Sequence, residues 1–392
     1  MTASARSLDP VSFLLVTHSY PPVMGGSEIE AQRICAELIK RGHRVTVLCA
    51  GGGPMPRVAR WVDPCGVPVR LFGARWPGRW RDRAYALGVA WTILSERRNY
   101  QLVYFLMQGL HLAVGLPVAR AIGKPVIMKF SASTIIPMMT KSWLGRLELR
   151  WLRQWARRIM ILNPGMEQEA SAVGFPLRQL LWMPNPVDID RFVPATADQR
   201  ITLRADLGVP AAAEVALFVG RLDPQKELRT LVRSFAHVAG QLPGSRLVLV
   251  GDGPDRDDLR SLAGKLGVSS RIMFMGRLPE TGVLQWLQAS DVFVMTSSFE
   301  GLPCALVEAM ATGLPSVVSD IPGHTQLIEH QVHGLVAGLG DDEATGKAMV
   351  GLLGDASLRA RMGAAARARV IATYPTEKVT SRYEALFAEV LS

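Results

Sequence analysis

The sequence predicts an α/β fold with two doubly wound parallel-sheet domains that face a central cleft. Short apolar runs alternate with longer amphipathic stretches along most of the chain, and Gly- or Pro-containing turns separate them. The alternation pauses at the polar stretch 195–200 and then starts again, and 392 residues suit two domains. We therefore expect an N-terminal domain over 1–194 and a C-terminal domain over 195–372, with the ligand site in the cleft between them.

The composition is that of a globular protein whose charge is unevenly distributed. Hydrophobic residues make up 48% of the chain and charged residues 20%, which is enough to build a sizeable core. The net charge is +10, and residues 1–194 carry 25 Lys and Arg against 12 Asp and Glu. This basic half indicates an anionic partner, such as a membrane surface, a phosphate-bearing lipid, an acidic polymer or a nucleic acid.

Cysteine usage and hydropathy favour a cytoplasmic protein. The four cysteines form no C-x-x-C pair, which favours a reducing compartment and no structural zinc. The first ten residues lack the apolar core of a signal peptide. The apolar stretch 102–119 contains Gln108, His111 and Pro117, so it suits a strand and a helix better than a membrane span.

The first half opens with two predicted strands, at 11–17 and 45–49, around a loop and a helix. Gly25 and Gly26 end the loop, and Ser27 is a suitable helix N-cap with Glu30 as its capping-box partner. A glycine turn that faces a helix N-terminus accepts phosphate well, although a plain strand–helix loop has the same residues. Further strands are expected within 98–107, 125–130 and 159–162.

Two segments of the first half combine basic residues with tryptophan. Residues 51–83 are predicted to be irregular, and they end in the Arg- and Trp-rich run 75–83. Residues 141–158 are predicted to be a helix with one aromatic and apolar stripe, formed by Trp143, Leu147, Trp151 and Trp155. Such segments suit an anionic membrane, an anionic acceptor or, for the loop, single-stranded nucleic acid. A solvated loop and a core-facing helix stripe are the alternatives.

The second half repeats the alternation of strands and helices. Strands are expected at 214–219, 246–250, 271–275, 292–296, 316–319 and 334–336. Helices are expected at 228–239, 257–266, 283–289, 304–312, 343–353, 356–373 and 383–391.

Residues 291–320 form the most informative strand–turn–helix–strand unit. Glu300 lies in its turn, and Glu308 lies eight residues later in its helix. The N–H groups that open this helix favour an anion between the two carboxylates. A ligand with hydroxyls at both ends and phosphate in the middle fits this layout, and a sugar nucleotide is such a ligand. The alternative interpretation is a solvated turn carboxylate and a surface helix residue.

Two cations lie close together between a predicted strand and a predicted helix. Arg221 and Lys226, five residues apart, would place a forked donor and a point charge beside an anion. They would neutralise a diphosphate and stabilise the charge of a departing phosphate. The alternative is a solvated basic loop.

Three motifs, in this order, resemble those of the retaining glycosyltransferases of the GT-B fold, group 1 (family GT4). They are GRLDPQK at 220–226, LVGDGPDRDDL at 249–259 and E-x7-E at 300–308. The resemblance covers most of the chain and is weaker in the N-terminal half. It implies two Rossmann-like domains, with an acceptor site in the first and a nucleotide-sugar site in the second. It also implies a last helix, within 373–392, that crosses back to the first domain, and a transfer that uses no metal and no cofactor.

The resemblance assigns roles to charged residues of the second half. Arg221 and Lys226 match the diphosphate ligands, and Glu300 matches the carboxylate that contacts the donor sugar. These three are the predicted catalytic residues. Glu308 matches the residue that holds the ribose hydroxyls, and Arg277 lies near the expected position of the base.

Backbone groups complete the implied donor site. Gly301, Leu302 and Pro303 would present main-chain groups to the sugar and the phosphate. Gly25 and Gly26 would close on the donor from the first domain.

Three positions depart from the family pattern. Ser131 stands where the family often has a His that touches the donor sugar, so the identity of the donor depends on this position. The run 185–188 replaces an Asn-Gly-Val-Asp turn, and Glu227 replaces a Gly. The D-x-D sequence at 188–190 lies between the predicted domains, and we interpret it as a turn and not as a metal site.

Together these features predict a retaining glycosyltransferase that acts on a nucleotide-diphosphate sugar donor. Its acceptor would be a glycan or a lipid-linked glycan, in cell-envelope or exopolysaccharide synthesis, and no nucleic-acid partner is expected. It would work in the cytoplasm, with a peripheral contact to an anionic membrane, at its inner face, as an open alternative. The other functions left open are a sugar-nucleotide 2-epimerase of the same fold, a phosphorylase, and a non-catalytic basic protein that binds a membrane or nucleic acid.

Overall fold

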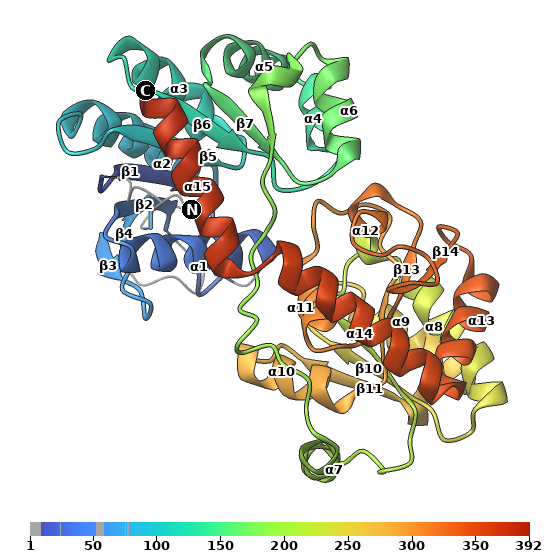
Figure 1. The fold of residues 1–392 in the computed structure, drawn as a ribbon. Coiled ribbons are helices and arrows are strands. Elements are labelled where there is room, and N and C mark those ends of the chain that lie inside the picture. The colour runs from blue at the N-terminus through green and yellow to red at the C-terminus, as the bar shows by residue number, and fades with distance from the viewer. Residues whose placement is uncertain (1–8, 24, 52–58, 75, 77) are drawn as a thin grey trace. The chain divides into compact units, whose positions relative to one another are not determined.

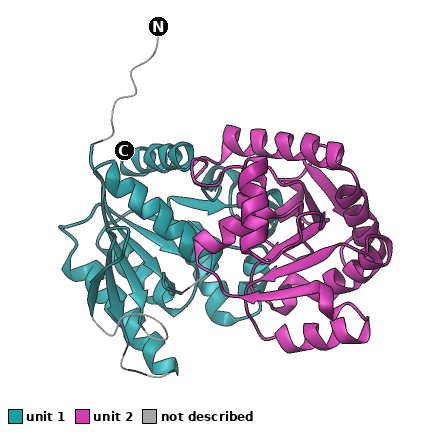
Figure 2. Cartoon of the chain, turned by 90° about the horizontal axis from the view of Figure 1, so that it is seen from below, with its two compact units in different colours: residues 1–186, 376–392 teal, residues 187–375 magenta. Residues whose placement is uncertain are grey.

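Two compact units make up the chain in a computed structural model, which describes residues 9–23, 25–51, 59–74, 76 and 78–392. Unit 1 combines Met1–Pro186 with Thr376–Ser392, and unit 2 is Val187–Pro375 (Figure 2). Each unit has one mainly or wholly parallel sheet with helices packed against it (Figure 1). The predicted fold class, two Rossmann-like α/β domains, is confirmed.

The units divide at slightly different places from the predicted boundaries, 194/195 and 372/373. The segment that starts at Val187 belongs to unit 2, because the Val187 N–H donates to the Tyr374 carbonyl at 2.9 Å and Phe192 is fully buried. The polar stretch 195–200, where the sequence places the boundary, lies inside unit 2, and a helix begins in it at Ala197.

Unit 1 contains an eight-stranded sheet in the order β3-β4-β2-β1-β5-β6-β7-β8, in which β3 alone is antiparallel to its neighbour. The strands are β1 (Ser12–Thr17), β2 (Arg44–Ala50), β3 (Arg60–Val62), β4 (Pro68–Phe72), β5 (Leu102–Leu106), β6 (Val126–Lys129), β7 (Arg158–Ile161) and β8 (Leu180–Trp182). The helices are α1 (Gly26–Lys40), α2 (Gly78–Ser95), α3 (Leu110–Ala121), α4 (Ile135–Thr140), α5 (Trp143–Trp155), α6 (Pro164–Ala172), the short η1 (Leu177–Gln179) and α15 (Thr376–Leu391).

The helices of unit 1 cover both faces of its sheet. Strand residues such as Phe13 point to the face where α1 and α15 lie side by side, as Figure 1 shows with α15 in red. Alternate residues such as Phe105 point to the other face, where Phe105 contacts Gly115 of α3. On that second face α2 packs against α3, and α3 packs against α5.

The prediction that segment 51–83 is irregular is wrong for most of its described residues. It contains β3, β4 and the start of α2. The alternation of buried Val69 and Leu71 in β4 is a strand pattern that the surrounding arginines and glycines obscured. Arg75 and Pro77 of the Arg- and Trp-rich run lie outside the described residues.

Unit 2 contains a six-stranded sheet, parallel throughout, in the order β11-β10-β9-β12-β13-β14. The strands are β9 (Val215–Val219), β10 (Arg246–Val250), β11 (Ile272–Gly276), β12 (Val292–Met295), β13 (Ser316–Ser319) and β14 (Gly334–Ala337). The helices are α7 (Ala197–Asp206), η2 (Pro224–Lys226), α8 (Leu228–Gln241), α9 (Arg256–Lys265), η3 (Ser269–Arg271), α10 (Glu280–Ala289), α11 (Cys304–Ala311), α12 (Pro322–Thr325), α13 (Asp342–Gly354) and α14 (Ala356–Thr373).

Helix α8 buries the regular apolar face that its sequence predicts. Its buried residues include Leu228, Leu231, Phe235 and Val238, at the three- and four-residue spacing of one helix face. They join β9, β10 and α13 in the larger core of unit 2.

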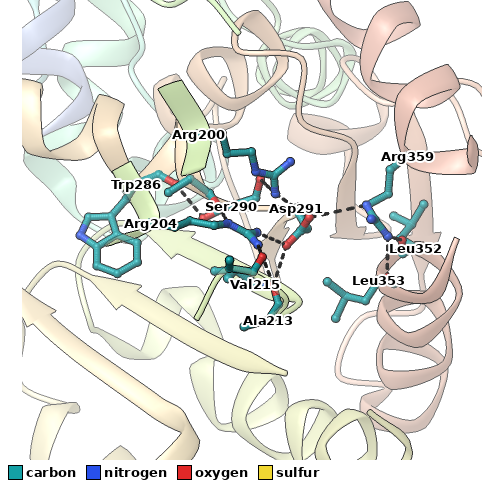
Figure 3. A network of polar contacts seen from close by, with 12 residues as sticks. Arg200, Arg204, Ala213, Val215, Trp286, Ser290, Asp291, Leu352, Leu353 and Arg359 are labelled. Atoms are coloured by element: carbon teal, nitrogen blue, oxygen red, sulfur yellow. Dashed lines mark hydrogen bonds and ion pairs between the residues drawn. The ribbon is translucent and has the colours of Figure 1, made fainter. Parts of the chain in front are cut away.

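An aspartate ties four elements of unit 2 together at the amino ends of its strands. Asp291, directly before β12, accepts hydrogen bonds from Arg204 of α7 at 2.6 Å and from the Val215 N–H of β9 at 2.8 Å (Figure 3). Its other oxygen pairs with Arg200 at 2.5 Å and lies 3.7 Å from Arg359 of α14. The loops that hold the predicted site residues lie at the opposite, carboxyl ends of the strands.

Candidate functional site

The predicted site segments lie at the carboxyl ends of adjacent strands of unit 2. Strand β9 lies between β10 and β12, so the segment after β9, 220–226, is a neighbour of the segment after β12, 296–303. This is the edge at which parallel α/β sheets bind their ligands.

Lys226 and Glu300 form a close ion pair at this edge. The Lys226 Nζ donates to the Glu300 Oε1 at 2.5 Å, and the Ser297 hydroxyl donates to the same oxygen at 2.8 Å. The side chain of Lys226 is 14% exposed and that of Glu300 is 9% exposed. Two of the three residues predicted to be catalytic are therefore in contact.

Hydrogen bonds to the backbone hold the two segments against each other. The Gln225 side-chain amide donates to the Phe299 carbonyl at 2.8 Å, and the Ser298 N–H donates to the Gln225 carbonyl at 2.8 Å. The Thr296 hydroxyl donates to the Lys226 carbonyl at 2.9 Å. The ion pair thus lies on a fixed frame, since its partners come from segments joined by main-chain contacts.

Arg221 lies on the same segment but points elsewhere. Its side chain is 68% exposed, and its Nε lies 3.2 Å from Asp223. The structure therefore does not bring this predicted catalytic guanidinium to the Lys226–Glu300 pair, although Arg221 and Lys226 both follow β9.

Glycines allow the loops after β9 and β10 to pack backbone to backbone. Gly251 has a φ of +135°, and a Cβ there would lie 1.8 Å from the Gly220 carbonyl oxygen. A Cβ on Gly253 would lie 2.2 Å from the Leu222 oxygen. The motif at 249–259 therefore fixes the path of the segment that carries Arg221. Arg277, predicted to lie near the base, is exposed directly after the neighbouring strand β11.

The turn from Glu300 to Pro303 is buried and leads into α11. Gly301 and Leu302 are buried, and Pro303 occupies the N-cap position, one residue before the predicted helix start. Glu308 is a buried residue of α11. The alternative interpretation of Glu308 as a surface helix residue is thus wrong, because this carboxylate is mostly withdrawn from solvent.

A second layer of polar residues, which the sequence did not indicate, supports the turn. The Ser319 hydroxyl donates to the Ser297 carbonyl at 2.6 Å, and the Gln326 side chain donates to the Gly301 carbonyl at 3.0 Å. His324 is fully buried, its Nδ1 lies 3.0 Å from the Ser319 carbonyl, and burial lowers its pKa to about 4. The polar residue that ends the buried strand β13, Ser319, is the available signal in the sequence.

The predicted glycines of the first domain lie at the start of α1. Gly25 is the N-cap residue and Gly26 is the first helical residue, so the predicted cap at Ser27 is wrong. Glu30, its predicted capping-box partner, is instead buried in an ion pair with Lys129 of β6 at 2.5 Å. Gly25 has no side chain, so this cap residue makes no side-chain cap hydrogen bond.

The structure also shows the surroundings of Ser131 and of the D-x-D sequence at 188–190. Ser131 follows β6 and is partly buried. The Asp188 side chain accepts hydrogen bonds from the N–H groups of Asp190 and Arg191, at 3.2 and 3.1 Å, which is the geometry of a turn.

The fold of this chain is that of the GT-B glycosyltransferases, with two Rossmann-like domains. The chain belongs to the group 1 glycosyltransferases: residues 199–369 match the model "Glycosyl transferases group 1", and residues 25–186 match "Glycosyl transferase 4-like domain". It is therefore a glycosyltransferase of the GT4 type, as its motifs predicted.

Curated relatives are glycosyltransferases of several kinds. The chain is 33% identical over 230 residues to the lipopolysaccharide core biosynthesis glycosyltransferase LpsE of Rhizobium meliloti, over 59% of this chain and 64% of the relative. It thus spans slightly less than two thirds of that relative. It is 28% identical to the N-acetyl-alpha-D-glucosaminyl L-malate synthase of Bacillus anthracis, over 94% of this chain and 95% of the relative.

Solved structures share the fold at low sequence identity. Anabaena HepE in complex with UDP and glucose superimposes with a TM-score of 0.81 at 21% identity, over 97% of this chain and 100% of that chain. Sucrose-phosphate synthase from Thermosynechococcus elongatus gives a TM-score of 0.83 at 20% identity, over 97% and 99% of the two chains. Among the described residues, no helix has the length and apolar character needed to cross a membrane.

Proposed function

We propose that the chain is a retaining glycosyltransferase that transfers a sugar from a nucleotide-diphosphate donor to a hydroxyl of a glycan or lipid-linked glycan. The observation that carries this proposal is the Lys226–Glu300 pair, held by Ser297 at the carboxyl edge of the sheet. A cation and a carboxylate fixed side by side suit a ligand that brings a phosphate and a sugar hydroxyl together. The UDP and glucose bound in HepE, a structure of the same fold, are in line with this ligand class.

Each predicted residue has a role in this proposal. Lys226 takes a phosphate oxygen, and the long, exposed Arg221 turns from Asp223 to the same diphosphate. Glu300 accepts hydroxyls of the donor sugar, and Glu308 accepts the ribose hydroxyls. Arg277 contacts the base.

Main-chain groups complete the donor site in the same proposal. Gly301, Leu302 and Pro303 offer backbone groups at the opening of α11, where the helix dipole favours the phosphate. Gly25 and Gly26 close on the donor from the start of α1. The glycines there permit a close backbone approach, because they carry no side chain.

The reaction forms one bond and breaks another at the anomeric carbon. The acceptor oxygen bonds to that carbon on the face from which the phosphate leaves, and the bond from the carbon to the β-phosphate oxygen breaks. The departing phosphate takes the proton of the acceptor hydroxyl, so the products are the glycoside and the nucleoside diphosphate. Lys226 and Arg221 stabilise the charge that grows on the leaving phosphate.

Cell-envelope or exopolysaccharide synthesis is the process that we propose, on the cytoplasmic side of the membrane. The LpsE relative acts in lipopolysaccharide core biosynthesis by its name. All four cysteines are free, which suits a reducing compartment.

The test of this function is a donor screen followed by one substitution. Thermal shift against UDP-, GDP-, ADP- and dTDP-sugars identifies the donor, and turnover is then measured with Lys226→Ala. We expect kcat to fall by at least about a hundredfold, because one phosphate counter-charge is lost. Lys347→Ala, at an exposed lysine of α13, is the matched control and should keep full activity.

Unchanged turnover in a folded Lys226→Ala variant would refute the proposal. Product analysis separates the related reactions: conversion of the free sugar nucleotide without an acceptor indicates an epimerase, and dependence on inorganic phosphate indicates a phosphorylase. Net retention at the anomeric carbon is read from the product by NMR.

A further inference from the structure

Helix α2 of unit 1 carries a stripe of large apolar side chains that face solvent. Trp80, Leu87, Trp91 and Leu94 are 50%, 66%, 67% and 42% exposed. Their spacings of seven, four and three residues place them on one side of the helix. We call these four residues the α2 stripe.

The stripe is not needed to hold α2 on its unit. The buried residues of α2 lie on the opposite side of the helix and include Tyr85, Val89 and Ile93. The Tyr85 hydroxyl donates to the Thr17 carbonyl of β1 at 2.5 Å, and Ile93 lies against Gly115 of α3. The helix is therefore anchored by its inner side, and its outer, apolar side faces solvent.

Positive charge surrounds the stripe. Arg79 and Arg83 lie over the Trp80 ring, with their guanidinium carbons 5.9 and 4.9 Å from its centre. Arg97 and Arg98 are exposed just beyond the end of the helix. Each guanidinium near the stripe can reach an anionic group while the indole remains in an apolar layer.

Acidic residues are scarce across this helical layer and are already engaged. Residues 78–155 contain twelve Lys and Arg, of which Lys129 is buried in its ion pair with Glu30, and three Asp and Glu. Glu96 pairs with Arg70, Asp82 lies 3.2 Å from His18, and Glu148 is buried. The surface around the stripe is thus cationic with little acidic compensation.

Helix α5 adds a similar surface on the same face of the sheet, because α3 packs against both α2 and α5. Trp143 is 71% exposed, and Arg146 and Arg150 are exposed beside it. Trp151 and Trp155 stack on each other with 5.2 Å between ring centres, and neither is fully buried. The stripe predicted at 141–158 is therefore not a core stripe, since the buried side of α5 is formed by Gly145, Glu148, Leu149 and Leu152.

We propose that the α2 stripe docks on the surface of an anionic phospholipid bilayer, with α5 as a second contact. Trp and Leu side chains enter the boundary between headgroups and acyl chains, and the flanking arginines bind lipid phosphates. Nucleic acid fits less well, because Leu87 and Leu94 alternate with the tryptophans where a nucleic-acid surface would carry cations. This docking does not depend on the proposed sugar transfer. If both hold, the docking favours an acceptor that is held at the lipid headgroups.

The experiment is co-sedimentation of the full chain with two kinds of vesicle. One is phosphatidylcholine alone, and the other contains about a third phosphatidylglycerol, so that the negative surface potential is the variable. We expect binding to the anionic vesicles that weakens with salt, and at least about tenfold weaker binding for the double variant Leu87→Ser with Trp91→Ser. Arg79→Gln with Arg83→Gln should lose the preference for anionic vesicles.

A matched control distinguishes the effect of the α2 stripe on vesicle binding from the effect of any exposed apolar side chain. Leu177 of η1, 65% exposed in the same unit, is replaced by Ser and should leave vesicle binding unchanged. The proposal is overturned if the wild-type chain does not sediment with anionic vesicles, or if Leu177→Ser weakens binding as much as the double variant. Binding to a single-stranded oligonucleotide in place of vesicles would overturn it as well.

Donor binding is measured in the same samples by thermal shift. The stripe variants should keep the donor-induced shift, which shows that they are folded. Loss of vesicle binding with donor binding intact leaves the proposed transfer standing, and vesicle binding without donor binding refutes the transfer alone.

Discussion

Ser297 is a residue whose contribution to the site can be measured separately from charge. Its hydroxyl donates to the same Glu300 oxygen as Lys226 does. We expect Ser297→Ala to lower kcat by about tenfold, because a hydrogen bond to a charged group contributes about 1.5–3 kcal/mol. Steady-state kinetics with the identified donor test this, with Ser261→Ala on the exposed side of α9 as the control. An unchanged kcat would mean that Lys226 and the turn orient Glu300 unaided.

Glu148 makes the stability of unit 1 depend on pH. Burial raises the pKa of this carboxyl to about 7, against the effect of a hydrogen bond from the Gly109 N–H. Between the ordinary Glu pKa and 7 the folded chain binds more protons than the unfolded chain, so stability falls as pH rises through this window and then levels off.

We therefore predict that Glu148→Gln changes stability in a pH-dependent way. The variant and the wild type should be alike near pH 5, and the variant should be more stable by about 2 kcal/mol at pH 8, because it carries no buried charge there. Thermal unfolding at the two pH values measures the difference, and the exposed Glu167→Gln serves as control. Equal stabilities at pH 8 would contradict a buried, ionised Glu148.

At the scale of elements, Asp291 is the clearest case of a side chain that supports the fold away from the site. It binds Arg204, Arg200 and the Val215 N–H at the amino ends of the strands. Asp291→Ala should cost unit 2 about 3 kcal/mol, because it leaves the buried Arg204 guanidinium without its carboxylate. Chemical unfolding monitored on unit 2 tests this. Donor affinity per folded molecule should be kept, and its loss would show that the network reaches the site.

The sequence predicted the elements of unit 2 better than those of unit 1. Helices such as α8 bury one regular face, and strands such as β12 are continuous apolar runs, so period and length suffice there. Helix α2 was missed because its outer side is nearly as apolar as its inner side. The amphipathic contrast that identifies a surface helix was absent.

Site residues that lie in a sequence motif could be predicted. Site residues that only the fold brings to the site could not. Lys226 and Glu300 were found from their motifs, and they are in contact. Ser319, the last residue of β13, contacts Ser297 through the packing of neighbouring strands, and His324 contacts Ser319; no spacing in the sequence encodes these contacts. The capping role expected of Glu30 failed for the same reason, since its partner Lys129 lies 99 residues away.

At the scale of the whole molecule, the chain closes unit 1 with its last helix. Helix α15 contributes Val379, Tyr383, Leu386, Phe387 and Val390 to the core of that unit. A chain that ends at Pro375 loses all five, worth about 10 kcal/mol of apolar burial, which is comparable to the stability of a domain. We expect unit 1 to lose its fold while unit 2 keeps its own.

Limited proteolysis of the shortened chain tests this expectation, with protection of Val187–Pro375 and loss of 9–186 as the predicted pattern. Phe387→Ala in the full chain is the milder variant and should cost about 3–5 kcal/mol. Protection of both units in the shortened chain would show that α15 is dispensable.

The contact between Lys226 and Glu300 also sets a condition on any molecule that binds there. In the proposed site, a lone phosphate that pairs with the Lys226 ammonium leaves the Glu300 carboxylate without its cation, so we expect such an ion to compete poorly with the donor. In the proposed function, a sugar diphosphate satisfies both partners, because its phosphate pairs with Lys226 and its sugar hydroxyls donate hydrogen bonds to the Glu300 carboxylate. On the proposed function, we therefore expect the Lys226–Glu300 pair to favour ligands that carry both a phosphate and a sugar hydroxyl.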